Sequence, residues 1–272
     1  MPLTRFAPSP TGYLHLGHAY SALLAAESSA FLLRIEDIDP VRCKPEFTDA
    51  IFEDLHWLGL TWPEPVRRQS QHLADYAATL DRLRSMGLVY PCFCTRGEIE
   101  REAQSAVHAP HALGLLYPGT CRSLSERERA EKLERRFAAN WRLDVGAALR
   151  LTGSLFWHDR AKGRVEARPE IFGDVVLARK DVATSYHLSV TVDDHVQGIS
   201  LVTRGEDLFT STHIHRLLQA LLGYETPEYF HHALLKDAAG RRYAKRDKSV
   251  TLRHLREQGK TAQEIVGEVF CR

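Results

Sequence analysis

The stretch LTRFAPSPTGYLHLGH, residues 3–18, decides the fold class of this 272-residue chain. Residues 3–7 suit a short strand, and Pro8, Pro10 and Gly12 then break the chain into a loop. The Ala- and Leu-rich run at 17–27 is predicted to be helical. A buried strand is predicted at 31–35, which completes a βαβ unit. This order is typical of an α/β fold with a parallel sheet, in which nucleotides bind at the first strand–helix junction.

Patterns further along the chain predict two halves of one α/β fold separated by an insertion. Ser125 and Glu128 form a capping-box pattern that predicts a charged helix reaching about residue 138. Other helices are predicted at 46–58, 71–87, 186–194 and 207–222, and strands at 199–203 and 233–235. Short strand-like pieces fill 140–182, and two short helices close the chain. The predicted division is 1–88 and 185–237 for the halves, 89–184 for the insertion, and 238–272 for a basic loop with C-terminal helices.

Composition limits the function classes only weakly. Lys and Arg number 36 against 35 Asp and Glu, so the formal net charge is +1 and any contact with nucleic acid must be a local patch. No apolar run approaches the roughly 20 residues that span a bilayer, and the first residues lack a signal-peptide pattern. We therefore expect a cytoplasmic protein that does not enter a membrane.

The segment HLGH places His15, Gly17 and His18 where the first helix begins. A helix N-terminus offers free N–H groups to a phosphate, and a glycine lets an adenine ring approach the backbone. Two histidines one turn apart can donate to the same phosphates and stabilise charge that develops on phosphorus. Taken alone, the pattern fits two solvent-facing histidines equally well.

A Gly-led basic loop, GRRYAKRDK at 240–248, carries five cations. Such a loop can close over a triphosphate and neutralise the leaving pyrophosphate, although a charge run is more often a solvated turn. The basic loop supports a phosphate-binding role only in combination with the other motifs.

Six segments in order, RFAPSPTG, HLGH, LRIEDID, VDDH, TRGEDL and the basic loop, together resemble the glutamyl-tRNA synthetase family. The resemblance implies the Rossmann-like catalytic core of a class I aminoacyl-tRNA synthetase, split by a connective insertion and followed by a short helical segment. HLGH then corresponds to the HIGH motif and residues 242–246, RYAKR, to the KMSKS motif. Arg242 and Ala244 depart from that motif, so slower adenylation is expected. The stretch after HLGH is also several residues shorter than the family's.

The resemblance assigns roles residue by residue. Catalysis is expected from His15, His18 and Lys245. ATP binding is expected from His15, Gly17, His18, Arg242 and Lys245. Two guanidiniums suit a substrate with two carboxylates, and the acid of LRIED takes the substrate ammonium group. The expected glutamate-binding set is Arg5, Phe6, Ala7, Pro8, Ser9, Glu36, Tyr186 and Arg204.

Cys92, Cys94 and Cys121 lie within a 30-residue stretch of the insertion, and the chain has only five cysteines. Zinc prefers four tetrahedral ligands, and thiolates are among its common ones. The family's short members use a Cys-Cys-Tyr-Cys pattern, which adds Tyr117 and implies a Zn²⁺ site within about 90–122. His108 and His111 are alternative fourth ligands, and free thiols in a loop-rich segment are the simpler alternative.

Full glutamyl-tRNA synthetases continue past the basic loop into a domain that reads the anticodon, whereas this sequence stops soon after the loop. The chain is therefore similar to the truncated family of glutamyl-queuosine tRNA(Asp) synthetases. That resemblance implies activation of L-glutamate with ATP and Mg²⁺ without tRNA, and transfer of glutamate to the wobble queuosine of tRNA-Asp. A monomer is expected.

Three alternatives remain open at this point. A synthetase fragment would charge tRNA-Glu, and a nucleotidyltransferase of the pantothenate-synthetase kind shares H-x-G-H and a distant lysine loop. The third is a catalytically dead, synthetase-like RNA-binding protein, which only the altered basic loop supports.

Overall fold

A parallel βαβ unit opens the fold, as the first residues predict. The computed structural model describes residues 2–28, 30–95, 97–99, 116–135, 138–235 and 250–270. Strand β1 (Leu3–Phe6) leads through helix α1 (Leu16–Ser28) into β2 (Ala30–Ile35), which pairs with β1 in parallel. The two-residue strand β3 (Arg67–Arg68) continues this sheet beyond β2. The predictions for His108, His111, Arg242, Lys245 and the rest of the basic loop lie outside the described residues.

The second part of the parallel sheet comes from the C-terminal half. Strand β9 (Leu201–Gly205) pairs in parallel with β10 (Glu228–His232), and β10 pairs with β6 (Phe156–Asp159), which forms a hairpin with β7 (Gly163–Glu166). At the other edge, the Leu3 N–H donates to Ser200 Oγ at 2.8 Å and the Ser200 N–H donates to the Leu3 carbonyl at 3.0 Å. The two parts therefore adjoin at β1 and β9.

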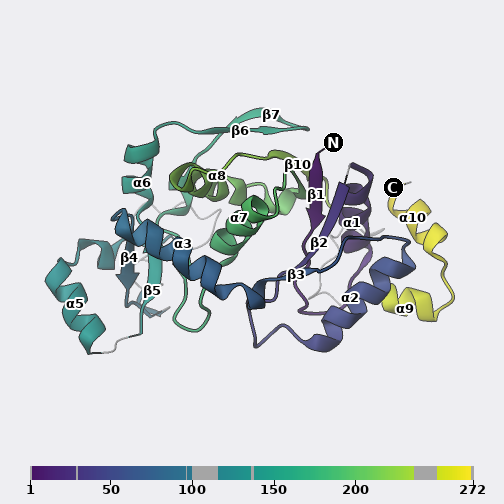
Figure 1. Cartoon of the computed structure of the whole chain (residues 1–272), viewed down its shortest axis with the longest axis horizontal. Helices are drawn as coiled ribbons and strands as arrows, with labels where there is room; N and C mark the ends of the chain where they lie inside the picture. The colour runs from purple at the N-terminus through teal and green to yellow at the C-terminus, as the bar shows by residue number, and fades with distance from the viewer. Residues whose placement is uncertain are drawn as a thin grey trace.

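Helices cover the sheet and connect its parts. Helix α1 packs on β1 and β9, and the C-terminal helix α10 (Ala262–Phe270) packs on α1. Helix α9 (Leu252–Glu257) contacts α2 (Pro45–Trp57), so both closing helices lie beside the first βαβ unit (Figure 1). Helix α7 (Tyr186–Val196) packs against α3 (Leu73–Ser85) and α8 (Ser211–Leu222).

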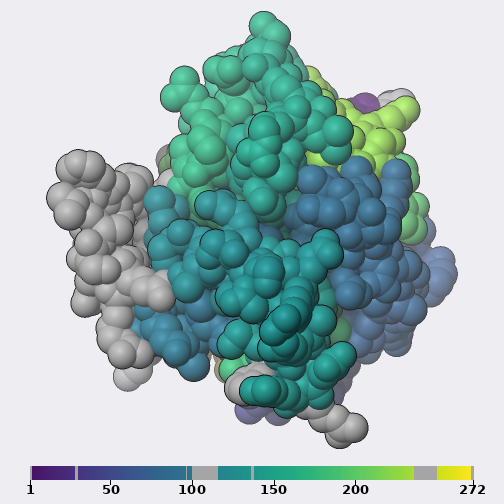
Figure 2. Space-filling view, turned by 90° about the vertical axis from the view of Figure 1, so that its left-hand side faces the viewer, coloured from purple at the N-terminus to yellow at the C-terminus, as the bar shows by residue number. Residues whose placement is uncertain are grey.

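A third, antiparallel sheet belongs to the insertion and lies at the far end of the molecule from α9 and α10 (Figure 1). Its order is β4 (Val89–Cys92), β5 (Asn140–Leu143) and β8 (Val176–Ala178). Helices α5 (Glu126–Glu134) and α6 (Val145–Thr152) accompany it. Viewed from this end, the teal segment with α5 and α6 covers the middle of the face beside the blue segment with α3 and β4 (Figure 2).

Two large apolar clusters form the core. One gathers the inner faces of α3, α7 and α8 with Trp157 of β6 and Tyr229 of β10. The other lies between α1, β2, α2 and the closing helices, where Leu252 and Ile265 are fully buried. The closing helices are therefore part of a hydrophobic core, because burying leucine and isoleucine side chains stabilises the packed state by roughly 1.5–3 kcal/mol each.

Most predicted elements are present with small shifts of their ends. The capping box at Ser125 is formed, since its side chain accepts from the Glu128 N–H and Glu128 reaches back to the Ser125 N–H. The helix it opens ends at Glu134, short of the predicted residue 138. Gly87 follows α3 with φ of 70°, a left-handed conformation that suits a helix end.

Two predictions in the second half were wrong. The last parallel strand is at Glu228–His232, whereas 233–235 was predicted. The prediction failed because EYFHH looks polar, yet His231 and His232 are buried. Helix α6 was also missed within the supposed run of strand pieces, although Asp144 caps it by accepting from the Ala147 N–H. None of the helices in the described part of the chain combines the length and apolarity that crossing a bilayer requires.

Candidate active site

A cleft of about 620 Å³ opens where the parallel strands end. Residues that follow β1 and β2, together with the last residues of β9 and β10, line it, which is where ligands bind in open parallel sheets. The structure brings every predicted substrate residue in its described part to this one cleft: Arg5, Phe6, Ala7, Pro8, Ser9, His15, Gly17, His18, Glu36, Tyr186 and Arg204.

The two motif histidines are held against the start of α1. His15 Nδ1 accepts from the Gly17 N–H at 3.1 Å, and His18 Nδ1 accepts from the His15 N–H at 3.1 Å. The ring centroids lie 3.7 Å apart. Because Nδ1 is an acceptor in each ring, a neutral imidazole at either position carries its proton on Nε2. Both rings are thereby prepared to donate a hydrogen bond from Nε2 to a phosphate oxygen.

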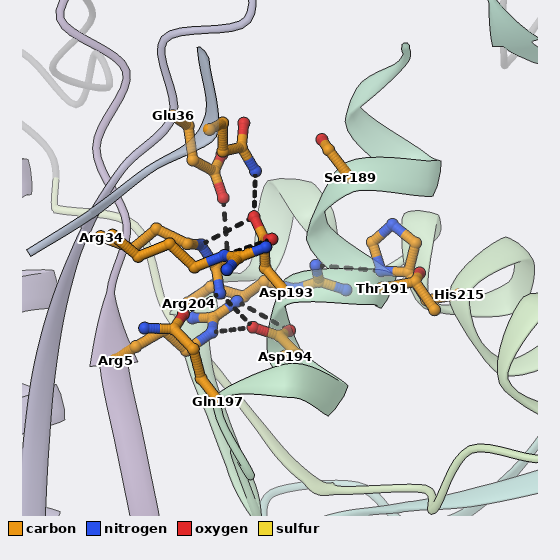
Figure 3. A network of polar contacts seen from close by, with 12 residues as sticks. Arg5, Arg34, Glu36, Ser189, Thr191, Asp193, Asp194, Gln197, Arg204 and His215 are labelled. Carbon is orange, nitrogen blue, oxygen red and sulfur yellow. Dashed lines mark hydrogen bonds and ion pairs between the residues drawn. The ribbon is translucent and has the colours of Figure 1, made fainter. Parts of the chain in front are cut away.

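A buried ionic network includes the cleft-lining residues Arg5 and Glu36 (Figure 3). The Arg34 guanidinium is completely buried and donates to Glu36 Oε1 at 3.1 Å and to Asp194 Oδ1 at 2.8 Å. Asp194 also accepts from Arg5 Nε at 2.9 Å, and Arg5 Nη1 donates to the Thr203 carbonyl at 3.3 Å. Arg34 thus fixes Glu36 and Asp194 fixes Arg5, and neither Arg34 nor Asp194 lines the cleft.

Asp193, the neighbour of Asp194, connects the network to β3 and α3. Its carboxylate accepts from Arg67 Nε, Gln69 Nε2 and the Tyr76 hydroxyl at 2.8–3.0 Å. Arg34 Nε lies 3.7 Å from the same carboxylate. One acid of the VDDH segment therefore connects β3 and α3, and the other holds Arg5 and Arg34.

Glu36 and Asp194, two of the three acids that face Arg34, have pKa values shifted in opposite directions. Burial raises the pKa of the Glu36 carboxyl above its ordinary value, although the guanidiniums of Arg34 and Arg5 oppose that shift. Burial would also raise the pKa of Asp194, but the guanidiniums of Arg5 and Arg34 lower it below its usual range. On acidification, Glu36 therefore takes up a proton before Asp194 does.

Arg204, at the end of β9, has a different environment. Its guanidinium donates to the Tyr186 hydroxyl at 3.1 Å, to Thr212 Oγ1 at 2.6 Å and to His231 Nε2 at 3.1 Å, and its Nη1 lies 3.3 Å from His215 Nδ1. Each of these four groups is uncharged when the histidines are neutral. Within the described ranges no carboxylate forms an ion pair with Arg204, so its charge is available to a ligand.

The chain returns to the cleft on both sides of segment 236–249, which lies outside the described residues. Leu235, just before it, lines the cleft. Just after it, Thr251 forms an isolated β-bridge with His15, and the Leu252 N–H donates to the Leu14 carbonyl at 2.8 Å. The two ends of the basic segment are therefore anchored at the cleft and at the HLGH motif.

The insertion brings Cys92, Cys94, Tyr117 and Cys121 together. All three Sγ atoms lie within 4.8 Å of one another, with Cys94 Sγ 3.4 Å from Cys121 Sγ and 3.7 Å from the Tyr117 hydroxyl oxygen. A disulfide would need about 2.05 Å between sulfurs. Two thiolates on one tetrahedral zinc are separated by about 3.8 Å. The three thiols therefore fit a zinc ion, and the Tyr117 hydroxyl lies beside them.

Several residues of the site could not be recognised from sequence reasoning. Asp194 lies in the VDDH segment, which was noted only as part of the resemblance. Thr212, His215 and His231 carried no sequence signal, because each resembles an ordinary polar residue of a helix or strand. Only the path of the chain reveals that all three contact one guanidinium.

Comparisons with known proteins agree with this geometry. Residues 3–272 match the family described as tRNA synthetases class I (E and Q), catalytic domain. A glutamyl-Q tRNA(Asp) synthetase of Rhodobacter capsulatus is 47% identical, over 97% of this chain and 98% of that protein. One from Nitratidesulfovibrio vulgaris is 43% identical, over 97% of this chain and 83% of that protein.

A solved structure with the same fold is a glutamate tRNA ligase from Elizabethkingia meningosepticum in complex with its amino acid, at a TM-score of 0.75 and 30% identity. It matches 90% of this chain, which spans about half (52%) of that longer enzyme. The fold is thus the Rossmann-like catalytic domain of class I synthetases. The chain belongs to the class I (E and Q) tRNA synthetases and, within them, to the glutamyl-Q tRNA(Asp) synthetases.

Proposed function

We propose that this ligase of the aminoacyl-tRNA synthetase type activates L-glutamate with ATP, without needing tRNA, and transfers the glutamyl group to queuosine at the wobble position of tRNA-Asp. The observation that carries the proposal is the cleft itself. It combines an arginine without a carboxylate partner among the described residues, a fixed acid and paired motif histidines in one volume. The near full-length match to relatives named glutamyl-Q tRNA(Asp) synthetase supports the choice of acceptor.

The amino-acid end of the cleft fits glutamate by charge. Arg204 offers a guanidinium to one substrate carboxylate, and Arg5 lines the same wall. Glu36 offers a carboxylate to the substrate ammonium group. Phe6, at the end of β1, and the loop residues Ala7, Pro8 and Ser9 lead from these charges to the HLGH motif. A dicarboxylic amino acid satisfies all three charged residues at once.

In the first step, a glutamate α-carboxylate oxygen attacks the α-phosphorus of ATP. The bond from the α-phosphorus to the bridging oxygen breaks, and pyrophosphate leaves with the electron pair. His15 and His18 donate from Nε2 to phosphate oxygens, and Gly17 lets the adenine approach the helix start. Arg242 and Lys245 hold the leaving phosphates in this proposal. Mg²⁺ bound to the phosphates would supply further charge neutralisation.

In the second step, a hydroxyl of the queuosine cyclopentenediol attacks the carbonyl carbon of the glutamyl-adenylate. An ester bond forms, the mixed-anhydride bond breaks and AMP leaves. No protein nucleophile is needed, because ATP has already activated the carboxylate and the cleft supplies orientation. We infer that the insertion is stabilised by Zn²⁺ held by Cys92, Cys94, Tyr117 and Cys121, that the chain acts as a monomer, and that 1–88 and 185–237 form the catalytic halves.

Glutamate-dependent ATP–pyrophosphate exchange without tRNA tests the first step. Transfer of labelled glutamate to tRNA-Asp, with and without queuosine, tests the second. We expect exchange without tRNA and transfer only to the queuosine-bearing tRNA. Exchange that requires tRNA-Glu would instead identify a charging synthetase, and no exchange with any amino acid would identify an RNA-binding protein without activity.

A further inference from the structure

Three histidines lie at or next to the Arg204 guanidinium, and we call them the Arg204 histidines: His215 and His231 are buried, and His187 is half-buried. His231 and His215 contact Arg204 directly, and His187 Nδ1 lies 3.2 Å from His215 Nε2. On the far side, His231 Nδ1 lies 2.6 Å from Asp159 Oδ2. Figure 3 shows His215 next to Arg204, on the side away from Arg34 and Glu36.

The contacts determine which nitrogen of each ring carries a proton. Every guanidinium nitrogen donates and none can accept. His231 Nε2 must therefore accept from Arg204 Nε, so the proton of that ring is on Nδ1 and is donated to Asp159. By the same argument, His215 Nδ1 accepts from Arg204 Nη1, and its proton is on Nε2, where it is donated to His187 Nδ1. A doubly protonated ring at 215 or 231 would place two donors face to face.

The same contacts account for four of the five N–H donors of the guanidinium. Nε faces His231, Nη1 faces His215 and the Tyr186 hydroxyl, and Nη2 faces Thr212. One N–H on Nη2 remains after these four contacts. The site thus holds Arg204 firmly and leaves its full positive charge without a compensating carboxylate in the described part of the chain.

We propose that His215 and His231 are positioning residues that hold Arg204 through neutral imidazoles of fixed tautomer, so that its charge is kept for the side-chain carboxylate of the amino-acid substrate. Had the same two positions been acids, Arg204 would sit in an ion pair, as Arg5 does with Asp194. Glutamate would then have to displace an internal carboxylate before binding. The inference deepens the function proposed above and rests on it for the identity of the substrate.

The surroundings keep these rings neutral. Burial is the largest cause and the positive charge of Arg204 is the second. Together they lower the pKa values of His231 and His187 to about 4, and the pKa of His215 well below its usual value. The groups that face His215 are His187 and Tyr186 of α7, Arg204 of β9, His231 of β10 and Arg5 of β1.

His231 faces a different set of groups, namely Arg204, Thr212 of α8, Asp159 of β6 and, further away, Lys162 of the β6–β7 turn. Only Asp159 favours the imidazolium form, and it is outweighed by burial and by the cations. Both rings that contact Arg204 therefore stay neutral across the physiological range.

Replacing His215 by asparagine or by aspartate, which have nearly the same shape, separates the effect of a negative charge at this position from the effect of side-chain shape. The Oδ1 atom of asparagine or aspartate falls where His215 Nδ1 lies, so both variants keep an acceptor for Arg204, and only aspartate adds a negative charge. We expect His215→Asn to keep the glutamate KM in pyrophosphate exchange within about 5-fold. We expect His215→Asp to raise it by about 10- to 100-fold with the ATP KM unchanged, since the internal carboxylate competes with the substrate.

The matched control is His213, two residues earlier on α8. It is also buried, and its Nδ1 accepts a hydrogen bond, but from the Arg168 N–H instead of Arg204. His213→Asn and His213→Asp should leave the ratio of glutamate KM to ATP KM unchanged, whatever they do to thermal stability. Equal effects of His215→Asn and His215→Asp, or an equal glutamate effect at His213, would overturn the proposal.

Nitrogen NMR of the imidazoles tests the protonation pattern without any substrate. In ¹⁵N-labelled protein at pH 7, assigned with the single-histidine variants, we expect the Nδ1–H tautomer for His231 and the Nε2–H tautomer for His215. An imidazolium or the opposite tautomer at either position would refute the positioning role. Wild-type protein with these tautomers but no glutamate-dependent exchange would refute the proposed function instead, so the two failures are distinguishable.

Discussion

Arg34 is a fully buried arginine that joins three carboxylates, those of Glu36, Asp193 and Asp194. It does not line the cleft, yet it fixes the acid assigned to the substrate ammonium and the acid that holds Arg5. Its role is to position charged groups, because an unpaired acid at this depth would be neutralised or would move. The placement of Glu36, and through Asp194 that of Arg5, therefore depends on the Arg34 side chain.

Replacing Arg34 by methionine, which keeps much of the volume, should lower the free energy of unfolding by about 3–5 kcal/mol, since it leaves buried acids without their counter-charge. Urea unfolding at pH 7 measures this loss. Arg42→Met is the matched control: its side chain is 66% exposed and pairs with Asp39, so a change within about 0.5 kcal/mol is expected. Similar losses at the two positions would show that Arg34 contributes no more than a surface ion pair.

At the scale of elements, helix α9 links the basic segment to the rest of the catalytic fold. It begins next to the His15 motif and docks on α2, where Asp54 is completely buried and its carboxylate oxygens find no hydrogen-bond partner among the described residues. Arg256 Nη1 of α9 lies 3.8 Å away. Burial is the main reason that the pKa of Asp54 is raised to about 6, while Arg256 opposes the shift.

Because the pKa of Asp54 is raised on folding, its protonated form stabilises the protein at low pH, and that contribution is lost as pH rises through about 6. We expect Asp54→Asn to be more stable relative to wild type at pH 8 than at pH 5, by about 1–3 kcal/mol. Urea unfolding of both proteins at the two pH values provides the comparison. A difference between wild type and variant that stays constant with pH would show that Asp54 does not titrate in this range.

The insertion depends on its cysteine cluster, because its own core there is small. In the described part of the chain, the buried members of this core are Tyr90, Cys92, Tyr117 and Cys121. A metal bound by side chains from β4 and from residues 117–121 would tie together segments that few apolar contacts hold.

We expect about one zinc per chain in protein purified without chelator, and loss of that zinc in Cys94→Ser, because three ligands of a structural site bind far more weakly than four. Elemental analysis by mass spectrometry gives the metal content. Cys43→Ser, which changes a cysteine outside the cluster, should retain the metal. A wild-type protein without zinc, or equal zinc in both variants, would contradict the assignment.

At the scale of the whole molecule, buried neutral histidines couple folding to pH. The folded pKa values of His187, His213 and His231 are lowered to about 4, chiefly by burial. A histidine with a lowered pKa binds fewer protons when folded than when unfolded. Its contribution to stability is therefore complete above the ordinary value of about 6.5 and is lost as pH falls from there toward 4.

The free energy of unfolding should thus fall between pH 6.5 and pH 5 by up to about 1.4 kcal/mol per pH unit for each such histidine. Thermal unfolding at closely spaced pH values would follow this loss. His213→Asn removes one of these groups without touching Arg204 and should make the slope shallower. If the slope is the same in the variant, His213 is already protonated in the folded protein.

The sequence by itself determined the order of the elements through β2, the helix ends at Gly87 and Ser125, and part of the set of residues that line the cleft. These features were predictable because backbone preferences act over a few neighbouring residues. The functional residue types of each short motif are likewise adjacent in the sequence. The assigned roles of those residues in binding and catalysis remain predictions.

Only the tertiary structure decided which charges meet. Arg5 and Asp194 are 189 positions apart, and His231 and Asp159 are 72 apart, so no local pattern relates them. The polar strand β10 could not be recognised, because its buried histidines are satisfied by partners on β6, β9 and the adjacent helices α1 and α8. Whether a histidine is neutral or charged depends on burial and on the groups that surround it. Those are properties of the path of the chain through space, and a linear sequence does not display them.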